Sequence, residues 1–254
     1  MDYLTALLLG LVQGVAEWLP ISSEAMVTLV GQFVAGLTYQ DALTMAIWLH
    51  LGTFLAALVY FKREVWNLVT GKDLKLLMFL GVATVLTGLI AMPLLMLAFS
   101  VEIPQSWGTL GIGLLLITMA FLNKKKKGGV VKEATWEKAL PVGVAQGFAA
   151  LPGLSRSGLT VATLLAEGFS LEAAFRLSFL MSLPVTLGVQ LVLPLLRGGF
   201  VVTGPMMVGG LVAFLVGLAT IGGLLKVARQ KDFFKVTLAL GVLVSLLGLG
   251  LMFF

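Results

Sequence analysis

The 254-residue sequence contains no cysteine and a single histidine. Without cysteine the chain can form neither disulfides nor thiolate nucleophiles, and one histidine does not make a zinc site of the usual kind. Charged residues are also scarce, at 11% of the chain, whereas soluble domains contain about 25%. These absences exclude an ordinary soluble domain.

The sequence is rich in apolar residues. They make up 59% of the sequence, and the mean hydropathy is +1.06. This composition predicts an all-α polytopic membrane protein. We expect no cleaved signal peptide, because the segment MDYLTALLLG lacks a basic n-region and a small-residue cleavage site. The net charge of +5 is concentrated in short loops, which suits anionic lipid headgroups rather than nucleic acid.

Two kinds of apolar run alternate along the chain. Continuous runs, each a predicted span, lie near 42–61, 76–98, 108–123, 172–195, 206–226 and 235–254. Interrupted runs lie at about 4–36, broken by LPISSE at 19–24, and about 139–168, broken by LPGLSRSG at 151–158. An interrupted run is too short for two spans of about 20 residues each. We therefore predict two re-entrant hairpins, whose non-helical turns must lie against protein or water.

The two interrupted runs resemble each other. GLVQGVAEWLPISS at 10–23 aligns with GVAQGFAALPGLS at 143–155, and HLGT at 50–53 falls opposite SLPVT at 182–186. Chance similarity between apolar segments is the alternative explanation. A hairpin adds no net crossing and three spans add an odd number, so the second half, about 139–254, should be inverted relative to the first, about 1–127. Both halves are expected to form a single membrane domain, 1–254.

The distribution of basic residues gives an orientation. The loops at 62–75, 124–138 and 226–235 are strongly basic, whereas those at 99–107 and 196–205 contain only Arg197. Because basic loops are retained on the cytoplasmic side, this pattern predicts an external N-terminus for a protein of the plasma membrane.

The polar residues of the two interrupted runs are expected to meet near the membrane centre. They are Gln13, Glu17, Ser22, Ser23 and Glu24 in the first run, and Gln146, Ser155, Arg156 and Ser157 in the second. An arginine at that depth is costly and therefore suggests function. Helix N-termini and the forked guanidinium favour an anion such as phosphate. Glu17 is either a metal ligand beside that phosphate or the counter-ion of Arg156.

Two structural alternatives stay open at this point. Arg156 could snorkel from a loop at the membrane surface. Alternatively, a Glu17–Arg156 pair with capping serines could serve only to hold the two hairpins together.

These residues resemble the BacA-type undecaprenyl pyrophosphate phosphatase family, which is identified by the motifs (E/Q)-x-x-x-E and P-G-x-S-R-S-x-x-T. The corresponding segments are QGVAE at 13–17 and PGLSRSGLT at 152–160, and the similarity extends through LPISS and LGTFLAALVYFKRE at 51–64 to nearly the whole chain. The resemblance implies inverted repeats with two re-entrant hairpins. It also implies removal of the terminal phosphate from a C55-type polyprenyl diphosphate lipid, with Mg²⁺ or Ca²⁺ as cofactor.

The resemblance also implies roles for individual residues. Glu17 would be a metal-binding or acid/base carboxylate, Ser23 the nucleophile and Arg156 the phosphate clamp. Further contacts to the substrate are expected from Gln13, Ser22, Gln146, Gly153, Ser155, Ser157 and Thr160.

The sequence departs from the family pattern at two positions. Gln13 stands where many relatives have glutamate, and Met26 stands where the family has a histidine, three residues after the serine. Methionine cannot transfer a proton, so His50 and Glu24 become candidates for that role, with a structural hydrogen bond as the alternative for His50. A transporter or flippase for a prenyl phosphate or another anion, acting without hydrolysis, is the competing function. A homodimer is also left open.

Overall fold

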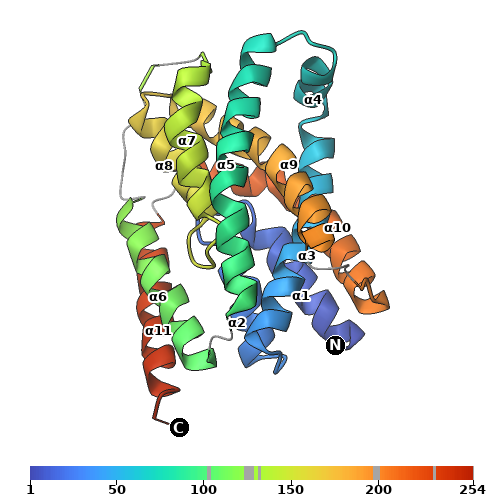
Figure 1. The fold of residues 1–254 in the computed structure, drawn as a ribbon, viewed down its shortest axis with the longest axis vertical. Coiled ribbons are helices and arrows are strands. Elements are labelled where there is room, and N and C mark those ends of the chain that lie inside the picture. Colours follow the sequence, from blue (N-terminus) through green and yellow to red (C-terminus); the bar gives the residue numbers. More distant parts are fainter. Residues whose placement is uncertain (102–103, 123–128, 131–132, 197–200, 231–232, 254) are drawn as a thin grey trace.

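The computed structural model describes residues 1–101, 104–122, 129–130, 133–196, 201–230 and 233–253, which form eleven α-helices and no β-strand (Figure 1). The helices are α1 (Tyr3–Ala16), α2 (Ser23–Phe33), α3 (Tyr39–Tyr60), α4 (Lys62–Val69), α5 (Leu74–Ser100), α6 (Gln105–Leu122), α7 (Trp136–Phe148), α8 (Arg156–Ala166), α9 (Leu171–Leu196), α10 (Gly204–Gln230) and α11 (Phe234–Gly250). Several of the basic residues used to predict the orientation lie outside this description: Lys124 to Lys127, Lys132, Arg197, Lys231 and the side chain of Arg229.

Five of these helices, α3, α5, α6, α9 and α10, are long and apolar enough to cross a membrane. The prediction of an all-α, multi-pass membrane protein is therefore confirmed. The sixth predicted span, 235–254, forms the shorter helix α11, which has 17 residues. The short helix α4 was not predicted, because its sequence KREVWNLV lies in a loop expected only to carry positive charge.

Short polar side chains fix where several helices begin. Asp2 accepts a hydrogen bond from the Thr5 backbone N–H at 2.8 Å, which lowers the pKa of the Asp2 carboxyl group. Thr38 accepts one from the Asp41 backbone N–H at 3.1 Å at the start of α3. Such caps satisfy amide groups that have no partner within the helix.

Both interrupted runs form helical hairpins, with turns at residues 17–22 and 149–155. A serine caps the outgoing helix in each case: Ser22 accepts from the Ala25 N–H at 3.4 Å, and Ser155 from the Gly158 N–H at 3.2 Å. The predicted positions of the turns are confirmed. One detail differs, because Glu24 lies in the first turn of α2 rather than in the break.

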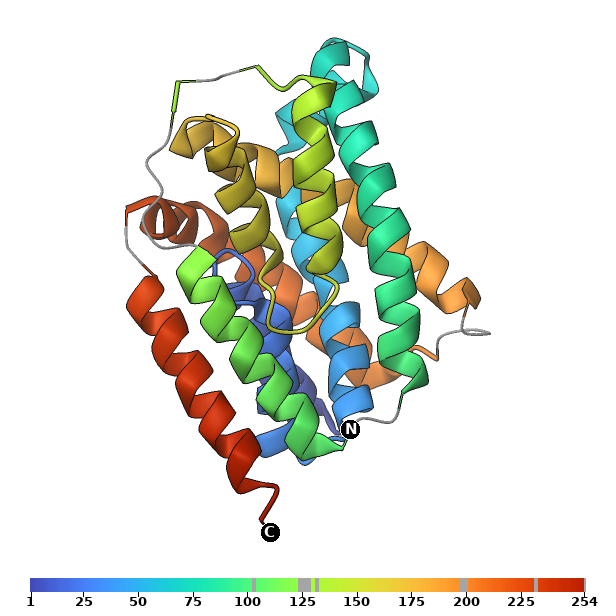
Figure 2. The same cartoon turned by 60° about the vertical axis from the view of Figure 1, so that its left-hand side comes forward.

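The two turns meet in the middle of the molecule. Figure 2 shows the α1–α2 turn approaching from the end where the N-terminus lies, and the α7–α8 turn approaching from the opposite end. They are in contact, since the Gly153 N–H donates to the Ser22 hydroxyl at 3.3 Å. The expected juxtaposition of the two turns is therefore present, whereas their re-entrance into a bilayer and the inversion of the two halves stay predictions.

Glycines let the helices of the two halves approach each other closely. Helix α1 packs on α10, and α7 packs on α5. A Cβ atom on Gly14 would lie 2.9 Å from the backbone nitrogen of Gly217, and one on Gly147 would lie 2.6 Å from the Cβ atom of Ile90. Both Gly14 and Gly147 belong to the repeated G-x-x-Q-G-x-A pattern. Close helix packing, which small residues permit in membranes, therefore accounts for these glycines.

Candidate active site

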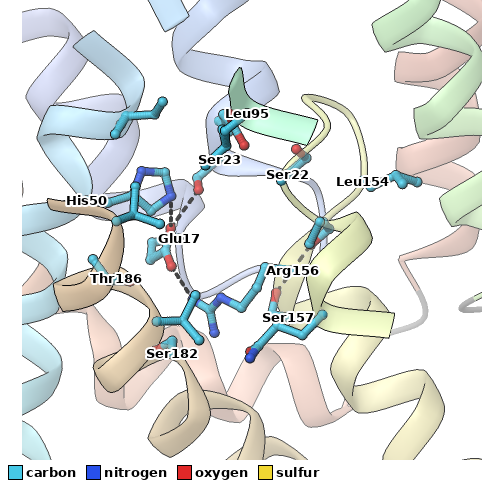
Figure 3. Close-up of a pocket in the computed structure, with 18 of the residues that line it drawn as sticks. Glu17, Ser22, Ser23, His50, Leu95, Leu154, Arg156, Ser157, Ser182 and Thr186 are labelled. Atoms are coloured by element: carbon cyan, nitrogen blue, oxygen red, sulfur yellow. Dashed lines mark hydrogen bonds and ion pairs between the residues drawn. The ribbon is translucent and has the colours of Figure 1, made fainter. Parts of the chain in front are cut away.

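An open-sided cavity lies where the two hairpin turns meet (Figure 3). Its empty volume is about 820 Å³ when the open solvent at its mouth is included. Side chains from both hairpins and from α3, α5 and α9 line it. Its polar lining consists of Glu17, Ser22, Ser23, Glu24, His50, Gln146, Ser155, Arg156, Ser157, Ser182, Thr186 and Gln190. Its apolar lining consists of Leu19, Ile47, Leu95, Ala149, Ala150, Leu154, Val185 and Val189. The cavity thus combines polar groups with a substantial apolar wall.

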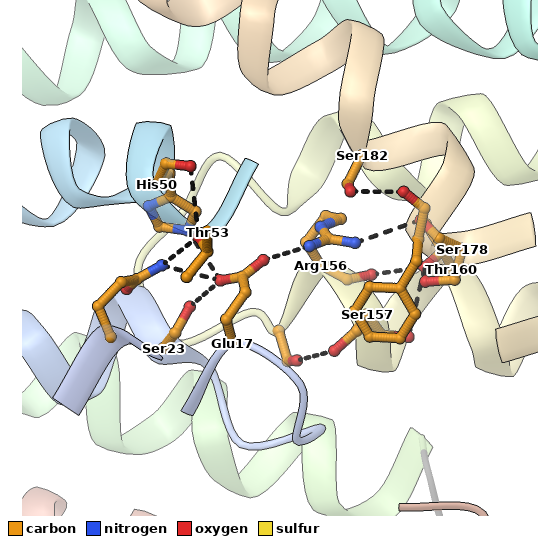
Figure 4. Close-up of polar contacts among 12 residues, drawn as sticks. Glu17, Ser23, His50, Thr53, Arg156, Ser157, Thr160, Ser178 and Ser182 are labelled. Atoms are coloured by element: carbon orange, nitrogen blue, oxygen red, sulfur yellow. Dashed lines mark hydrogen bonds and ion pairs between the residues drawn. The ribbon is translucent and has the colours of Figure 1, made fainter. Parts of the chain in front are cut away.

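Glu17 lies at the centre of the polar network (Figure 4). Its Oε1 atom pairs with the guanidinium of Arg156. Its Oε2 atom accepts hydrogen bonds from the Ser23 hydroxyl at 2.6 Å and from the Gln13 amide at 3.0 Å, and His50 Nε2 lies 3.3 Å away. Because the carboxylate side chain is only 7% exposed, these partners replace the water that would otherwise stabilise its charge.

His50 is oriented by its second ring nitrogen. The Nδ1 atom lies 2.7 Å from the backbone oxygen of Ala46. A carbonyl oxygen can only accept a hydrogen bond, so Nδ1 carries a proton and Nε2 is turned toward Glu17. Nε2 thus faces the Oε2 atom of Glu17 at 3.3 Å. The structure therefore brings the single histidine of the chain into contact with the candidate catalytic carboxylate.

Arg156 points inward from the first residue of α8. Its Nη2 atom contacts Glu17, its Nη1 atom donates to the Ser178 backbone oxygen at 3.2 Å, and its guanidinium carbon lies 5.5 Å from the centre of the Phe179 ring. The side chain is 18% exposed. The snorkelling alternative is therefore wrong. The structural ion pair with Glu17 is present, but it borders a cavity rather than a dry contact between hairpins.

The four predicted serines have different surroundings. Ser22 caps α2 and also accepts from the Gly153 N–H. Ser155 caps α8, and its hydroxyl lies 3.3 Å from that of Ser157. Ser23 differs from the other three, because its hydroxyl donates to a carboxylate oxygen. This contact is the arrangement expected of an activated hydroxyl nucleophile.

Three residues expected to contact substrate lie behind the cavity wall, and none of them lines the cavity. Gln13 is fully buried and donates to Glu17 and, at 3.2 Å, to the Thr53 hydroxyl. Thr160 is also fully buried, and its hydroxyl donates to the backbone oxygen of Arg156 at 2.8 Å. Gly153 contributes the N–H that joins the two turns. These residues hold the lining residues in place.

One face of α9 carries a polar stripe that was not predicted from the sequence. It consists of residues spaced by four, Ser178, Ser182, Thr186 and Gln190, and the last three line the cavity. Residues four apart share one face of a helix. Polar side chains at this spacing within an apolar span are a signal that the face is turned toward a cavity.

Met26 packs against an apolar cluster that includes Ala25, Leu29 and Ile47. Its side chain is not among those that line the cavity. The position at which the resemblance implies a histidine therefore belongs to the packing around the site.

Divalent cations such as Mg²⁺ and Ca²⁺ prefer oxygen ligands. Both oxygens of Glu17 already have partners, and within the described ranges no group of three or more His, Cys, Asp or Glu residues is arranged to hold a metal ion. Glu24 lines the cavity without a hydrogen bond or ion pair to any described residue. The described residues therefore offer no metal site made by protein alone, and Glu24 is a carboxylate of the cavity lining that has no such partner.

Comparison with known proteins gives a consistent result over nearly the full length. A family model described as bacitracin resistance protein BacA matches residues 6–244. An undecaprenyl-diphosphatase from Methanococcoides burtonii is 41% identical, covering 94% of this chain and 95% of the relative. Proteins of the same name from Saccharolobus islandicus and Pyrobaculum islandicum are 35% and 34% identical. They cover 98% and 96% of this chain, and 99% and 95% of their own lengths.

Proposed function

The chain belongs to the BacA family, and on that premise we propose that it is an integral membrane phosphatase. It removes the terminal phosphate from a polyprenyl diphosphate lipid of the undecaprenyl type. The observation that carries this proposal is the 2.6 Å hydrogen bond from the Ser23 hydroxyl to Glu17, beside Arg156. Phosphoryl transfer needs a nucleophile that is hydrogen-bonded to a base and a cation that binds the phosphate. Ser23 with Glu17 provides the first, and the guanidinium of Arg156 provides the second.

The first half of the reaction forms a phosphoserine. The Ser23 oxygen attacks the terminal phosphorus while its proton passes to Oε2 of Glu17. The bond between that phosphorus and the bridging oxygen breaks, and the prenyl monophosphate leaves with the electron pair. Because Oε2 already accepts the Ser23 hydrogen bond, the Ser23 hydroxyl needs no reorientation before the proton transfer.

The second half regenerates the enzyme. Water attacks the phosphorus of the phosphoserine, and the bond to the Ser23 oxygen breaks. Glu17 returns its proton to that oxygen. One proton of the water stays on the released inorganic phosphate, and the other passes to the solvent. The sum is one diphosphate and one water converted to two monophosphates.

Arg156 binds the terminal phosphate by exchanging partners. In the free protein its guanidinium pairs with Glu17. A phosphate in the cavity offers more negative charge and accepts two parallel hydrogen bonds from the fork. Glu17 keeps its contacts with Gln13 and His50 after this exchange, so it stays aligned with Ser23. The N-termini of α2 and α8 add unpaired N–H groups that favour the same anion.

The rest of the substrate and the cofactor can be assigned by chemistry. The apolar wall that includes Ile47, Leu95 and Val189 suits the first part of a prenyl chain. Mg²⁺ or Ca²⁺, which the resemblance implies, would be held by Glu24 together with the phosphate oxygens, and it would neutralise charge on them. The basic loops support a location in the plasma membrane with the N-terminus outside.

Phosphate release from a purified sample tests the proposal directly. Undecaprenyl diphosphate or farnesyl diphosphate is incubated with the protein in detergent and Mg²⁺ or Ca²⁺, and inorganic phosphate is measured. We expect release that requires Ser23, Glu17 and Arg156. Wild-type turnover after Glu17→Ala or Arg156→Ala would overturn the mechanism. Movement of the lipid across liposomes without phosphate release would replace it with the transport alternative, which the comparisons do not support.

A further inference from the structure

We propose that Phe179 is a positioning residue for Arg156. Its ring face, together with the backbone oxygen of Ser178, holds the guanidinium at the cavity wall after substrate phosphate has displaced Glu17. The inference rests on the proposed function and extends it to a residue that does not line the cavity.

The contacts of Arg156 divide between two parts of the molecule. One contact is to Glu17 on the first hairpin. The other two are on α9: the Ser178 oxygen at 3.2 Å and the Phe179 ring, whose centre lies 5.5 Å from the guanidinium carbon. A cation at this distance from an aromatic face is attracted by the ring electrons. When phosphate replaces Glu17, both α9 contacts can persist.

The ring is itself held rigidly. Phe179 is fully buried, with the Trp18 ring 5.6 Å away and the Phe61 ring stacked at 6.5 Å and 17°. Trp18 directly follows Glu17 in the sequence. The three rings of Trp18, Phe61 and Phe179 therefore pack next to both members of the ion pair between Glu17 and Arg156.

Helix α8, which carries Arg156, is also fixed to α9 at this point (Figure 4). The Thr160 hydroxyl contacts the Arg156 backbone oxygen at 2.8 Å and the Ser178 hydroxyl at 2.6 Å. The backbone of Arg156 is thus joined to the segment of α9 that contacts its guanidinium, Ser178 and Phe179, which we call the platform. Paired hydrogen bonds to phosphate depend on the plane of the fork, and the platform sets that plane.

The test compares two buried phenylalanines of the same apolar cluster. Phe179→Leu removes the ring face but keeps an apolar side chain, and Phe79→Leu makes the same change at a fully buried ring that contacts Phe169 at 6.5 Å. For Phe179→Leu we expect the KM for farnesyl diphosphate and the inhibition constant of inorganic phosphate to rise by about 3- to 30-fold. Phe79→Leu should lower the thermal midpoint similarly and leave both constants unchanged.

A double-mutant cycle then shows whether Phe179 acts through Arg156. If it does, Phe179→Leu adds less to the defect of Arg156→Lys than it causes in the wild-type protein, because lysine has no planar fork for the ring to orient. Additive losses, or equal KM increases in Phe179→Leu and Phe79→Leu, would overturn the inference. Failure of the proposed function looks different, since wild-type protein would then release no phosphate at all.

Discussion

Arg156 and Glu17 form an ion pair between the two hairpin turns, although they are 139 positions apart in the sequence. The side chains are 18% and 7% exposed. The pair closes the gap between the turns and at the same time presents a cation to the cavity. Removing Glu17 would leave Arg156 without its carboxylate partner, and removing Arg156 would leave Glu17 with only its hydrogen-bond donors and His50. Either change is more damaging than the loss of a surface pair.

Arg156→Lys should therefore impair substrate binding more than folding. Lysine keeps the charge but offers no planar fork, so we expect the KM to rise about tenfold or more, the cost of one charge-assisted hydrogen bond. Arg156→Ala should reduce turnover to background and destabilise the fold by about 3–5 kcal/mol. Steady-state phosphate release and thermal unfolding measure the two effects.

Arg176→Lys is the control for this change. Arg176 is 52% exposed and pairs with Glu64 at 3.8 Å, away from the cavity. We expect it to leave the KM within about twofold of wild type, because exposed ion pairs contribute little. Equal effects of the two substitutions would contradict a specific role for Arg156.

Ser23→Ala should abolish turnover. Loss of the nucleophile lowers kcat by about 10³-fold or more, while the buried environment of Glu17 stays otherwise intact. Ser170→Ala makes the same chemical change at the hydroxyl that accepts from the Ala173 N–H at 3.3 Å, and it should cost only about 1 kcal/mol of stability. Acid quenching during turnover, followed by mass spectrometry, should find phosphate on Ser23. A phosphorylated peptide that lacks Ser23 would place the nucleophile elsewhere.

Gly153→Ala should disrupt the meeting of the two turns. Gly153 has φ +106°, and a Cβ atom there would lie 2.9 Å from both the Ile112 backbone oxygen and the Leu115 side chain. We expect a loss of about 1–3 kcal/mol from backbone strain alone, with reduced turnover because α6 is pushed away. Gly36→Ala is the matched control, since φ is +66° but no atom lies within 4 Å. Gly36→Ala should lower the thermal midpoint less than Gly153→Ala and leave turnover unchanged. A larger loss in Gly36→Ala than in Gly153→Ala would contradict the close contact between Gly153 and α6.

Much of this site was predictable from the sequence, because charges and helix breakers are rare in an apolar chain. Pro20 and Pro152 marked the two turns, and both turns are where they were expected. The polar residues of the two turns were expected to meet because of the repeat. Glu17 was predicted to be either a metal ligand or the counter-ion of Arg156, and the structure shows the ion pair.

Other features depend on tertiary packing and were not visible in the sequence. Phe179 lies in the apolar segment LSFLMS, where nothing distinguishes it from its neighbours. His50 was named as a candidate for proton transfer, but its contact with Glu17 requires that α3 pack beside α1 at one particular rotation. Gln13 was expected to touch substrate, but the helix carrying it turns the side chain behind Glu17.

Glu24→Gln tests the position of the cation. Glutamine has the same shape but no charge, so we expect the Mg²⁺ or Ca²⁺ concentration for half-maximal activity to rise about tenfold, the effect of one lost charged ligand. A chelator should stop wild-type turnover, and added cation should restore it. Glu133→Gln, at an exposed residue that pairs with Lys75, should behave as wild type. Full activity of the wild-type protein in chelator would exclude the cation from the reaction.

Met26→His tests which residue supplies the proton path. The Ser23 hydroxyl already donates to Glu17, and His50 already faces the same carboxylate. We therefore expect a histidine at position 26 to raise kcat by no more than about twofold. His50→Asn should lower kcat by up to about 10²-fold, because Glu17, the base of the reaction, loses the ring that orients it. Both are measured as phosphate release at saturating substrate.

The stability of Met26→His needs its own control, because the side chain packs against an apolar cluster. Met92 packs against the same cluster and does not line the cavity either. Met26→His and Met92→His should each lose about 1–3 kcal/mol through burial of an imidazole without a partner. If Met26→His instead gained tenfold in kcat while His50→Asn stayed fully active, proton transfer would run through position 26. The contact between His50 and Glu17 would then serve only to hold α3 against the first hairpin.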